Sequence, residues 1–287
     1  MRHFHQMYRP ITATPFLRNA SYGEYEPCAA LKPYIRCFWG SRHPYRQKLT
    51  ERPEKTIVIP DTCMDIIFTV DFTNNCIAGR FCGINDSSFI SELKSGGERV
   101  VSVFAVRFYP WSAGLFAEDS LQGSKNGFFP LDCHFSKLRR EIAPFLFELT
   151  DMTERVEAVQ KILIRHIFLK EEHPAVRNAM AEILLKRGNV KIGGLTDNTS
   201  VGRRQLERIF NVYTGVSPKQ LSAMIRCQYL WRDILYSPKF DVQDAVYRYG
   251  YTDQSHLLRE FKRFHASPIP EARAYALAQR AGEAFPG

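Results

Sequence analysis

The chain has 287 residues, of which 45% are hydrophobic, 13% aromatic and 24% charged. This composition is typical of a folded protein and excludes wholesale disorder and a collagen-like fibre. At roughly 100 to 200 residues per domain, the length predicts two domains. No stretch approaches the ~18 consecutive apolar residues of a membrane span, and the first residues, MRHFHQMYRP, lack the apolar run of a signal peptide. We therefore expect a cytoplasmic protein with no membrane partner.

Positive charge is concentrated in the second half of the chain. The whole chain carries 39 Lys and Arg against 30 Asp and Glu, a net charge of +9. Residues 174–287 hold 17 basic and 10 acidic side chains, so +7 of this balance lies there. A basic half is typical of a protein that binds a polyanion such as nucleic acid, although a modest positive balance also favours solubility alone.

The first half is predicted to be rich in strands between residues 34 and 109. Five short apolar runs are separated by turn residues: YIRCFWG, TIVIP, CMDIIFTVDF, CIAGRFCGI and RVVSVFAVRFYP. In the third run the apolar even positions from Met64 to Val70 alternate with a more polar face, which is the period of two of a sheet with one dry side. The pattern predicts a β-rich domain of the barrel or sandwich type.

Beyond Ser136 the apolar spacing becomes helical and predicts two helices that close a first domain over residues 1–170. Their apolar stripes are Leu138, Ile142, Phe145 and Leu149 in the first helix, and Val156, Val159, Leu163 and Ile167 in the second. We expect the stripes to pack on the chain's own sheet. Pairing of the stripes between two chains, in a homodimer, is the alternative.

Residues 174–275 are predicted to be all helical, which makes the fold class α+β. Helix ends are marked by Pro174, Gly188, Ser217, Pro218, Gln220, Asp241, Gly250 and Asp253. Ser217 and Gln220 form a capping box, so a long helix is expected over about residues 218–236. Residues 276–287 are expected to form a C-terminal tail.

An internal repeat is the most informative feature of the second half. The stretch RQLERIFNVYTGVSP, shifted by 51 residues, lies on SHLLREFKRFHASPI, with Leu206 on Leu257 and Phe210 on Phe261. Each copy reads as a short helix, a tight turn and a longer helix, and the helix that begins at Pro218 joins the two copies. This is the organisation of paired helix-turn-helix units.

The longer helix of each copy has an apolar stripe and a polar face. At about 100° per residue, the polar faces carry Arg204, Arg208 and Asn211 in the first copy and Ser255, Arg259 and Lys262 in the second. Such a helix can enter a major groove, where guanidinium groups pair with guanine edges. A solvated basic face is the alternative for one helix, but its occurrence twice at equivalent positions favours DNA.

Two motifs resemble a known family. The stretch YRYGYTDQSHLLREFKRF, residues 247–264, is similar to the sequence around the second recognition helix of the AraC/XylS transcription regulators, and TGVSPKQLSAMIR, residues 214–226, is similar to the end of their first unit. The resemblance covers about residues 175–273. It implies two helix-turn-helix units on a connecting helix, promoter DNA as partner, and RNA polymerase as a second partner if the protein is an activator.

The resemblance also implies which side chains contact DNA. Base-edge contacts are expected from Arg204, Glu207, Arg208, Gln254, Ser255 and Arg259. Contacts to phosphates or flanking positions are expected from Arg203, Asn211, Thr252, His256, Lys262 and Arg263. The periodicity alone places four of the first six on the two polar faces.

The chain departs from the family at several turn positions. Ser200 and Ala266 stand where the family has Gly, and Thr196, Ile269 and Ala272 stand where it has Ala, Pro and Tyr. Gly193 and Gly194 each cost a helix about 1 kcal/mol relative to Ala. We therefore expect the first short helix of the first unit to be marginal and to be ordered by packing on its neighbours or on DNA.

The resemblance implies that the first domain senses a small molecule or mediates dimerisation. IPDTCMDIIFTV (residues 59–70) and AVRFYPWSA (residues 105–113) look like an N-terminal region of some members. The side chains expected to line an effector pocket are Trp39, Asp65, Arg107, Tyr109 and Trp111. The alternative is that the aromatic side chains belong to the core and that Arg107 is a structural ion-pair partner.

A regulator that senses metal or oxidation is the second hypothesis for the first domain. Cys76, Cys82, Cys133, His134, His3 and His5 supply soft ligands. Their spacing matches no recognised zinc motif, and a free Cys is commonly a small buried apolar residue, so we predict no metal and no cofactor.

An enzyme fused to a DNA-binding domain is the least favoured hypothesis. The chain contains none of the GxSxG, GxGxxG, GxxxxGK[ST] and HExxH motifs, and its eight His are scattered without an obvious carboxylate or Cys partner. We therefore expect a sequence-specific DNA-binding regulator controlled by a small-molecule effector, and not an enzyme.

Overall fold

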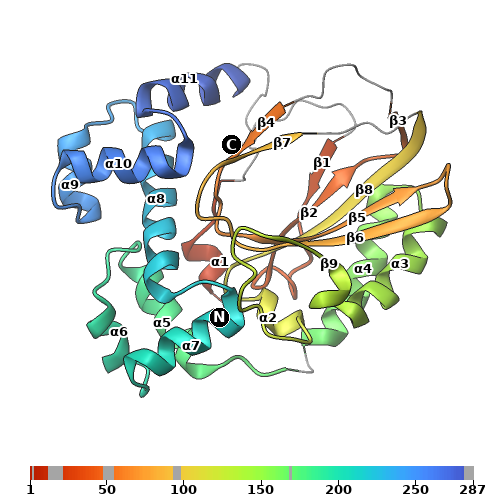
Figure 1. The fold of residues 1–287 in the computed structure, drawn as a ribbon, viewed down its shortest axis with the longest axis horizontal. Helices are drawn as coiled ribbons and strands as arrows, with labels where there is room; N and C mark the ends of the chain where they lie inside the picture. The colour runs from red at the N-terminus through yellow and green to blue at the C-terminus, as the bar shows by residue number, and fades with distance from the viewer. Residues whose placement is uncertain (2, 12–21, 48–54, 93–97, 168–169, 281–287) are drawn as a thin grey trace.

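The computed structural model describes residues 1, 3–11, 22–47, 55–92, 98–167 and 170–280. An antiparallel sheet with helices forms the N-terminal part, and a succession of helices forms the C-terminal part (Figure 1). The α+β class predicted from the periodicities is confirmed. Among the described residues, no helix combines the length and the apolar character needed to cross a bilayer.

The large sheet is antiparallel and has seven strands in the order β1-β2-β8-β5-β6-β9, with β3 paired to β8. These strands are β1 (Tyr22–Tyr25), β2 (Ile35–Ser41), β3 (Tyr45–Gln47), β5 (Met64–Asp71), β6 (Cys76–Cys82), β8 (Arg99–Phe108) and β9 (Phe128–Pro130). A separate pair is formed by β4 (Lys55–Val58) and β7 (Phe89–Glu92). Within the described ranges β1 and β9 are unpaired edges, so the sheet is open and does not close into a barrel.

The five predicted apolar runs correspond to β2, β4, β5, β6 and β8. The sequence did not indicate β1, β3, β7 and β9. These four strands have only three or four residues each, which is too short for an alternating pattern to stand out from its surroundings.

Two helices cover one face of the sheet, as predicted. They are α3 (Ser136–Glu148) and α4 (Met152–Ile167) (Figure 1). The predicted stripe of α3 was wrong in its second half, because Leu146 is buried whereas Phe145 is 39% exposed. The buried residues of α3 follow a spacing of four, from Leu138 through Ile142 to Leu146. These side chains lie in the chain's own core, so they are not available for pairing with a second chain.

Short helices lie before the first strand, between β8 and β9, and after β9, and seven helices form the described C-terminal part. The short ones are α1 (Phe4–Met7), α2 (Ala113–Phe116) and the 3₁₀ turn η1 (Leu131–Cys133). The C-terminal ones are α5 (Pro174–Leu185), α6 (Ile192–Asp197), α7 (Arg203–Thr214), α8 (Pro218–Tyr236), α9 (Val242–Tyr249), α10 (Gln254–His265) and α11 (Ile269–Arg280). The last helix, α11, continues beyond residue 275, so residues 276–280 of the predicted C-terminal tail are helical, and residues 281–287 lie outside the described residues.

The predicted caps are confirmed. Ser217 accepts the Gln220 N–H and the Gln220 side chain accepts the Ser217 N–H, which completes the capping box of α8. The side chains of Asp241 and Asp253 cap α9 and α10 by accepting the N–H groups of Asp244 and His256, and Gly250 ends α9 in the left-handed conformation. These caps supply partners for backbone groups that a helix end leaves unpaired.

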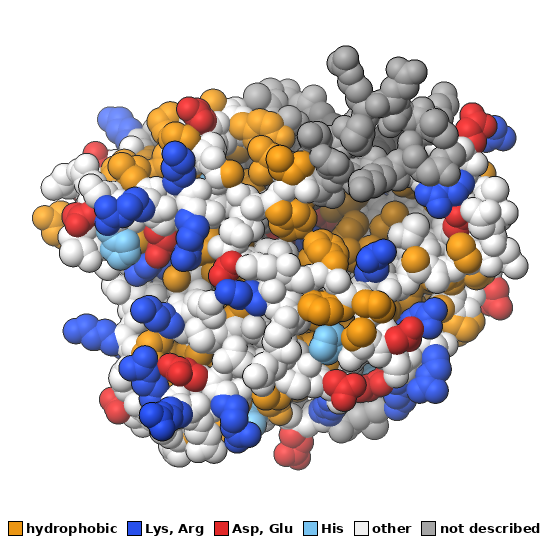
Figure 2. Space-filling view, in the orientation of Figure 1, with side chains coloured by type: hydrophobic (Ala, Val, Ile, Leu, Met, Phe, Trp, Pro, Cys, Tyr) orange, Lys and Arg blue, Asp and Glu red, His pale blue; other side chains and the backbone are white. Residues whose placement is uncertain are grey.

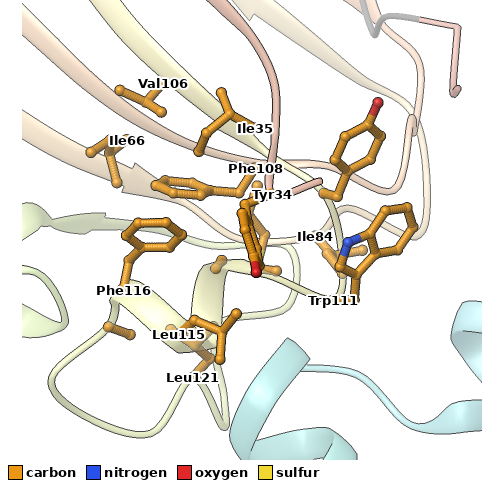
Figure 3. Close-up of a cluster of buried hydrophobic side chains, with 14 of the residues drawn as sticks. Tyr34, Ile35, Ile66, Ile84, Val106, Phe108, Trp111, Leu115, Phe116 and Leu121 are labelled. Atoms are coloured by element: carbon orange, nitrogen blue, oxygen red, sulfur yellow. The ribbon is translucent and has the colours of Figure 1, made fainter. Parts of the chain in front are cut away.

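Two apolar cores hold the molecule together, and the larger one crosses the boundary expected near residue 170. It joins the sheet to α5, α6, α7 and the first half of α8, and it includes Leu206 and Phe210. Figure 3 shows part of this core, where the rings of Phe108 and Phe116 lie 5.0 Å apart. The smaller core holds the second half of α8 with α9, α10 and α11.

The two turn positions at which the family has Gly adopt the left-handed conformation here. Ser200 has φ +56° and Ala266 has φ +58°, a region that favours Gly because a Cβ is crowded there. Gly193 and Gly194 of α6 have open space around the position of a Cβ, so their lack of a side chain serves no close contact. Leu195 is the buried residue by which α6 joins the core.

His265, the last residue of α10, is buried in the smaller core. Its ring stacks on Phe261 at 4.0 Å between centroids and lies 4.6 Å from the ring of Trp231. Nδ1 lies 3.3 Å from the carbonyl oxygen of Phe261, and no described residue hydrogen-bonds to Nε2. Burial disfavours the charged ring and lowers the pKa of His265 to about 3.

This burial predicts a pH-dependent loss of stability. An unfolded His binds a proton below pH ~6.5, whereas the folded His265 stays neutral, so the free energy of unfolding falls by about 1.4 kcal/mol per pH unit below 6.5. Between pH 6.5 and 5 the wild type should lose about 2 kcal/mol more than His265→Leu, measured by urea unfolding at each pH. Equal slopes for the two proteins would contradict the prediction.

Candidate nucleic-acid interface

The repeat predicted from the sequence forms two equivalent helix-turn-helix units. One is α6 with α7, the other is α9 with α10, and α8 joins them (Figure 1). Leu206 and Phe210 of α7 and the equivalent Leu257 and Phe261 of α10 are fully buried. The polar faces of α7 and α10 therefore point away from the cores, as predicted.

The first long helix presents its N-terminal half to solvent. Arg203, Arg204 and Arg208 are exposed. Glu207 is half-buried and accepts a bond from Arg203 Nε at 3.1 Å, and the Asn211 amide donates to the Glu207 carbonyl at 2.8 Å. Of the predicted base-reading side chains of α7, Arg204 and Arg208 are thus the more accessible.

The second long helix presents a similar surface. Gln254, Ser255 and Arg259 are exposed, as are the flanking Thr252, Lys262 and Arg263. The Gln254 amide donates to Gln243 of α9 at 2.6 Å. His256 is half-buried, with its ring edge-on to Tyr251 at 5.2 Å. The predicted base-reading residues of α10 therefore share one solvent-facing surface.

A buried ion pair fixes α10 to the connecting helix. Arg226 of α8 binds both carboxylate oxygens of Glu260 at 2.8 and 2.9 Å, and the Tyr251 hydroxyl donates to Glu260 at 2.8 Å. The Arg226 guanidinium also lies 4.3 Å from the Tyr251 ring centroid. Burial is the largest effect on Arg226 and disfavours its charge, but Glu260 and the Tyr251 hydroxyl together exceed this effect, so the pKa of Arg226 is raised. This pair sets how α10 lies on α8.

A second polar cluster fixes α9 to the connecting helix. The Tyr249 hydroxyl donates to Asp233 at 2.7 Å and to the carbonyl of Tyr229 at 3.1 Å, and Arg248 binds Asp233 at 2.6 Å. The sequence reasoning missed these positioning residues. Glu260, Tyr251 and Tyr249 lie inside the motif at residues 247–264, but their partners on α8 are 15 or more positions away.

The first long helix is fixed by the N-terminal part of the chain. The Leu121 N–H donates to the carbonyl of Val212 at 2.9 Å. Gly114 and Gly215 permit the close approach, since a Cβ on Gly114 would meet the Tyr213 carbonyl at 2.7 Å and one on Gly215 would meet Ser124 Oγ at 2.4 Å. These contacts hold the C-terminal end of α7 and leave its N-terminal half accessible.

Basic side chains gather over the helix-turn-helix units. Figure 2 shows Lys and Arg along the left of the view, over α6, α7, α9 and α10. The 19 residues of α8 span about 28 Å at 1.5 Å per residue. This length is comparable to the ~34 Å between successive major grooves on one side of DNA.

Comparisons with known families match both parts of the chain. Residues 195–274 match a family described as a helix-turn-helix domain. Residues 23–126 match a domain of unknown function (DUF6597). No curated protein matches the chain.

The solved structures that resemble the chain include those of ToxT from Vibrio cholerae. One, of strain SCE256 with a bound unsaturated fatty acid, has 14% sequence identity and a TM-score of 0.41, and covers 87% of this chain and 98% of ToxT. A second, from strain O395, has 13% identity and a TM-score of 0.41, and covers 86% of this chain and 99% of ToxT.

The chain therefore combines a C-terminal helix-turn-helix domain with an N-terminal region that matches a second domain family. Its C-terminal region is a helix-turn-helix domain of the AraC type, as the motifs at residues 214–226 and 247–264 predicted.

The predicted pocket residues of the N-terminal domain fall into two groups. Arg107 binds both oxygens of Asp65 at 2.9 and 3.1 Å, and Trp39 Nε1 donates to Asp65 at 2.8 Å. This group lies on the sheet face that the sequence predicted to be polar, yet Asp65 and Arg107 are buried because they pair with each other. Tyr109 and Trp111 stack at 4.5 Å within the larger core.

The cysteines do not form a metal site within the described residues. No group of three or more His, Cys, Asp or Glu side chains there is placed to hold a metal ion. Cys76 and Cys133 are exposed, whereas Cys82 is buried. Burial raises the pKa of Cys37 and of Cys82 to about 12, which disfavours the thiolate that metal binding and oxidation require.

The exposed face of α10 predicts how two of its side chains contribute to DNA binding. Arg259→Ala should weaken binding by about 1–3 kcal/mol at particular base pairs only, because a bidentate Arg reads a guanine edge. Its matched control, Lys262→Ala, should weaken binding on all sequences alike and lower the salt slope by about one, because this side chain is predicted to contact phosphate. Fluorescence anisotropy with matched and mismatched duplexes at several salt concentrations measures both effects. An equal loss on every sequence for Arg259→Ala would assign it to phosphate.

Proposed function

We propose that the protein is a sequence-specific transcription regulator that binds double-stranded DNA through α7 and α10 and responds to a small-molecule effector in its N-terminal domain. The observation that carries this proposal is the duplicated unit, with the same apolar anchors and with polar side chains at equivalent outward positions. On a surface that only contacts water, polar side chains need not occupy equivalent positions in the two units. Two helices that read neighbouring grooves of DNA do require this arrangement.

The two polar faces differ in sequence, and this sets the kind of site the protein reads. Arg204 and Arg208 on α7 face different base edges from Gln254, Ser255 and Arg259 on α10. One chain should therefore cover an asymmetric site of about two helical turns. The accessible halves of α7 and α10 supply the contacts, while Arg226 and Glu260 act as positioning residues.

Effector control is supported by a segment that links the two parts of the chain, residues 59–63, which we call the strap. Within the strap, Asp61 binds Arg107 at 3.3 Å. The carbonyl of the adjacent Pro60 accepts a bond from Gln228 Nε2 of α8 at 2.8 Å. A rearrangement around Arg107 would therefore be transmitted to the connecting helix.

The conformation of the strap is strained. Thr62 has φ +68°, which is rare for a β-branched residue and costs free energy that the surroundings must offset. The Thr62 hydroxyl lies 2.9 Å from the Tyr8 hydroxyl, and Gln228 Oε1 accepts the Ile11 N–H at 2.9 Å. Strained segments of this kind are typical of switch regions.

DNA reading is tested by selection from random double-stranded DNA with the full chain at near-physiological salt. We expect enrichment of one asymmetric motif that spans about two helical turns. The double variant Arg204→Ala, Arg259→Ala serves as control and should enrich no motif, because it lacks a guanidinium on each polar face. Equal retention of all sequences by the folded wild type would contradict the proposal, since only the phosphate backbone would then be recognised.

The strap is tested by Gln228→Leu, which removes the bonds to Pro60 and Ile11 with little change in volume. We expect the free energy of unfolding to fall by about 1–3 kcal/mol, because a buried carbonyl and N–H lose their partner. Amide hydrogen exchange in residues 59–63 should also become faster. Gln122→Leu, which changes an exposed glutamine, is the control and should alter neither quantity. Unchanged exchange in the strap of Gln228→Leu would rule out the proposed link.

A further inference from the structure

Within the described part of the N-terminal domain, one buried arginine has guanidinium atoms without a hydrogen-bond partner. Arg36 of β2 is only 8% exposed, and no described residue hydrogen-bonds to its Nε and Nη1, although both atoms are shielded from solvent. It sits where the register between β2 and β8 shifts, between Ile35 and Cys37.

The other two buried arginines of this domain have acceptors close to their guanidinium groups. Arg107 donates to Asp65 through Nε and Nη2, and its Nη1, which makes no hydrogen bond to a described residue, lies 3.3 Å from the carboxylate of Asp61. Arg155 donates to the carbonyls of Leu146 and Leu149 and to the Ser102 hydroxyl. Since a guanidinium stays charged in proteins, its burial without acceptors is strongly unfavourable. Arg36 is therefore an exception that requires an explanation.

None of the described groups near Arg36 offers its guanidinium an anionic acceptor at hydrogen-bonding distance. Those with which it interacts electrostatically are Cys37, Glu24, Cys63 and Tyr109. Burial keeps the Cys37 and Cys63 thiols and the Tyr109 hydroxyl in their neutral forms by raising each pKa. The Glu24 carboxylate is exposed and accepts a bond from the Tyr22 hydroxyl at 3.1 Å. An anionic acceptor from outside the chain would satisfy the guanidinium.

We propose that Arg36 anchors an oxyanion, the carboxylate or phosphate group of a small molecule, with Tyr109 beside it. The proposal rests on the proposed function in one respect, namely that this molecule is the effector. A carboxylate or a phosphate offers several acceptor oxygens to one guanidinium, and such charge-assisted bonds are about twice as strong as neutral ones.

The surroundings of Arg36 also connect such a ligand to the DNA-binding part. Tyr109 stacks on Trp111, the Trp111 ring lies 6.4 Å from that of Tyr8, and the Tyr8 ring lies 5.6 Å from that of Tyr229 on α8. Tyr8 also contacts Thr62 of the strap. An oxyanion at Arg36 is therefore joined to the connecting helix by a continuous series of ring contacts.

The first test needs no ligand. Arg36→Met keeps an apolar stem of similar length and removes a buried charge that has no partner, so the free protein should unfold at the same temperature as the wild type or higher. Arg107→Met is the matched comparison and should unfold at a clearly lower temperature, because it leaves Asp61 and Asp65 buried without their cation. A fall for Arg36→Met as large as that for Arg107→Met would overturn the proposal.

The second test measures binding to the full chain. Benzoate, acetate and inorganic phosphate are titrated at constant ionic strength against a chloride baseline, with benzamide and acetamide as neutral analogues. We expect at least one oxyanion to raise the wild-type unfolding temperature by a few degrees and to change tryptophan fluorescence. The neutral analogues should have no effect. Benzoate and acetate against phosphate distinguish a carboxylate ligand from a phosphate ligand.

Variants assign the binding to Arg36. Arg36→Met should abolish the oxyanion effect and Arg36→Lys should weaken it at least tenfold, because an ammonium cannot reproduce the planar fork. Arg46→Met, which changes an exposed arginine of β3, should behave as wild type. Binding retained in Arg36→Met, equal effects of benzamide and benzoate, or no effect of any oxyanion would each overturn the proposal.

Failure of this proposal can be told apart from failure of the proposed function. DNA selection is run on the same preparations of wild type and Arg36→Met. Oxyanion binding through Arg36 without an enriched motif would leave the anchor in place and overturn the regulator. An enriched motif without oxyanion binding would overturn the anchor and leave the regulator in place.

Discussion

The burial of Leu206 and Phe210 in the same apolar core as the sheet is the constraint on which the rest of the structure depends. Because this core is shared, the first long helix is oriented by the N-terminal part of the chain, and the Leu121–Val212 hydrogen bond holds its C-terminal end. The polar face of α7 is thereby directed to solvent. The connecting helix starts from the same core and packs against the second unit with its far half, and Arg226 near its middle binds Glu260 and so fixes α10.

Polar contacts then determine how the N-terminal and C-terminal parts of the chain are oriented relative to each other. The apolar core supplies most of the free energy of association but little direction, since burial of apolar area is non-directional. Direction comes from the strap, where Asp61 binds Arg107 and Pro60 binds Gln228. The strain at Thr62 shows that the chain holds this segment in place against its own conformational preference. A regulator gains from such an arrangement, because a small change at a strained segment shifts the balance between two packings.

The sequence predicted the helices and strands better than it predicted which side chains contact one another in the fold. Caps and apolar spacing placed α8, α9 and α10 correctly, because these signals lie within a few residues of each other. The choice of Phe145 over Leu146 was wrong because both fit a helical stripe, and only the position of the sheet selects one. Trp39, Asp65 and Arg107 were expected in one place and do meet, whereas Arg36 was overlooked because a lone arginine in an apolar strand has no pattern around it.

By itself, the sequence determined the class of fold, the duplicated helical unit and the side chains that face outward from its two long helices. Each of these follows from local periodicity and from residues that begin or end helices. Only the tertiary structure decided that the first unit shares the core of the sheet, that Gln228 meets Pro60 across 168 positions, and that Arg36 is buried without an acceptor. The physical reason is that such pairings depend on which surfaces are brought together, and hydrogen-bond partners far apart in the chain leave no periodic trace in the sequence.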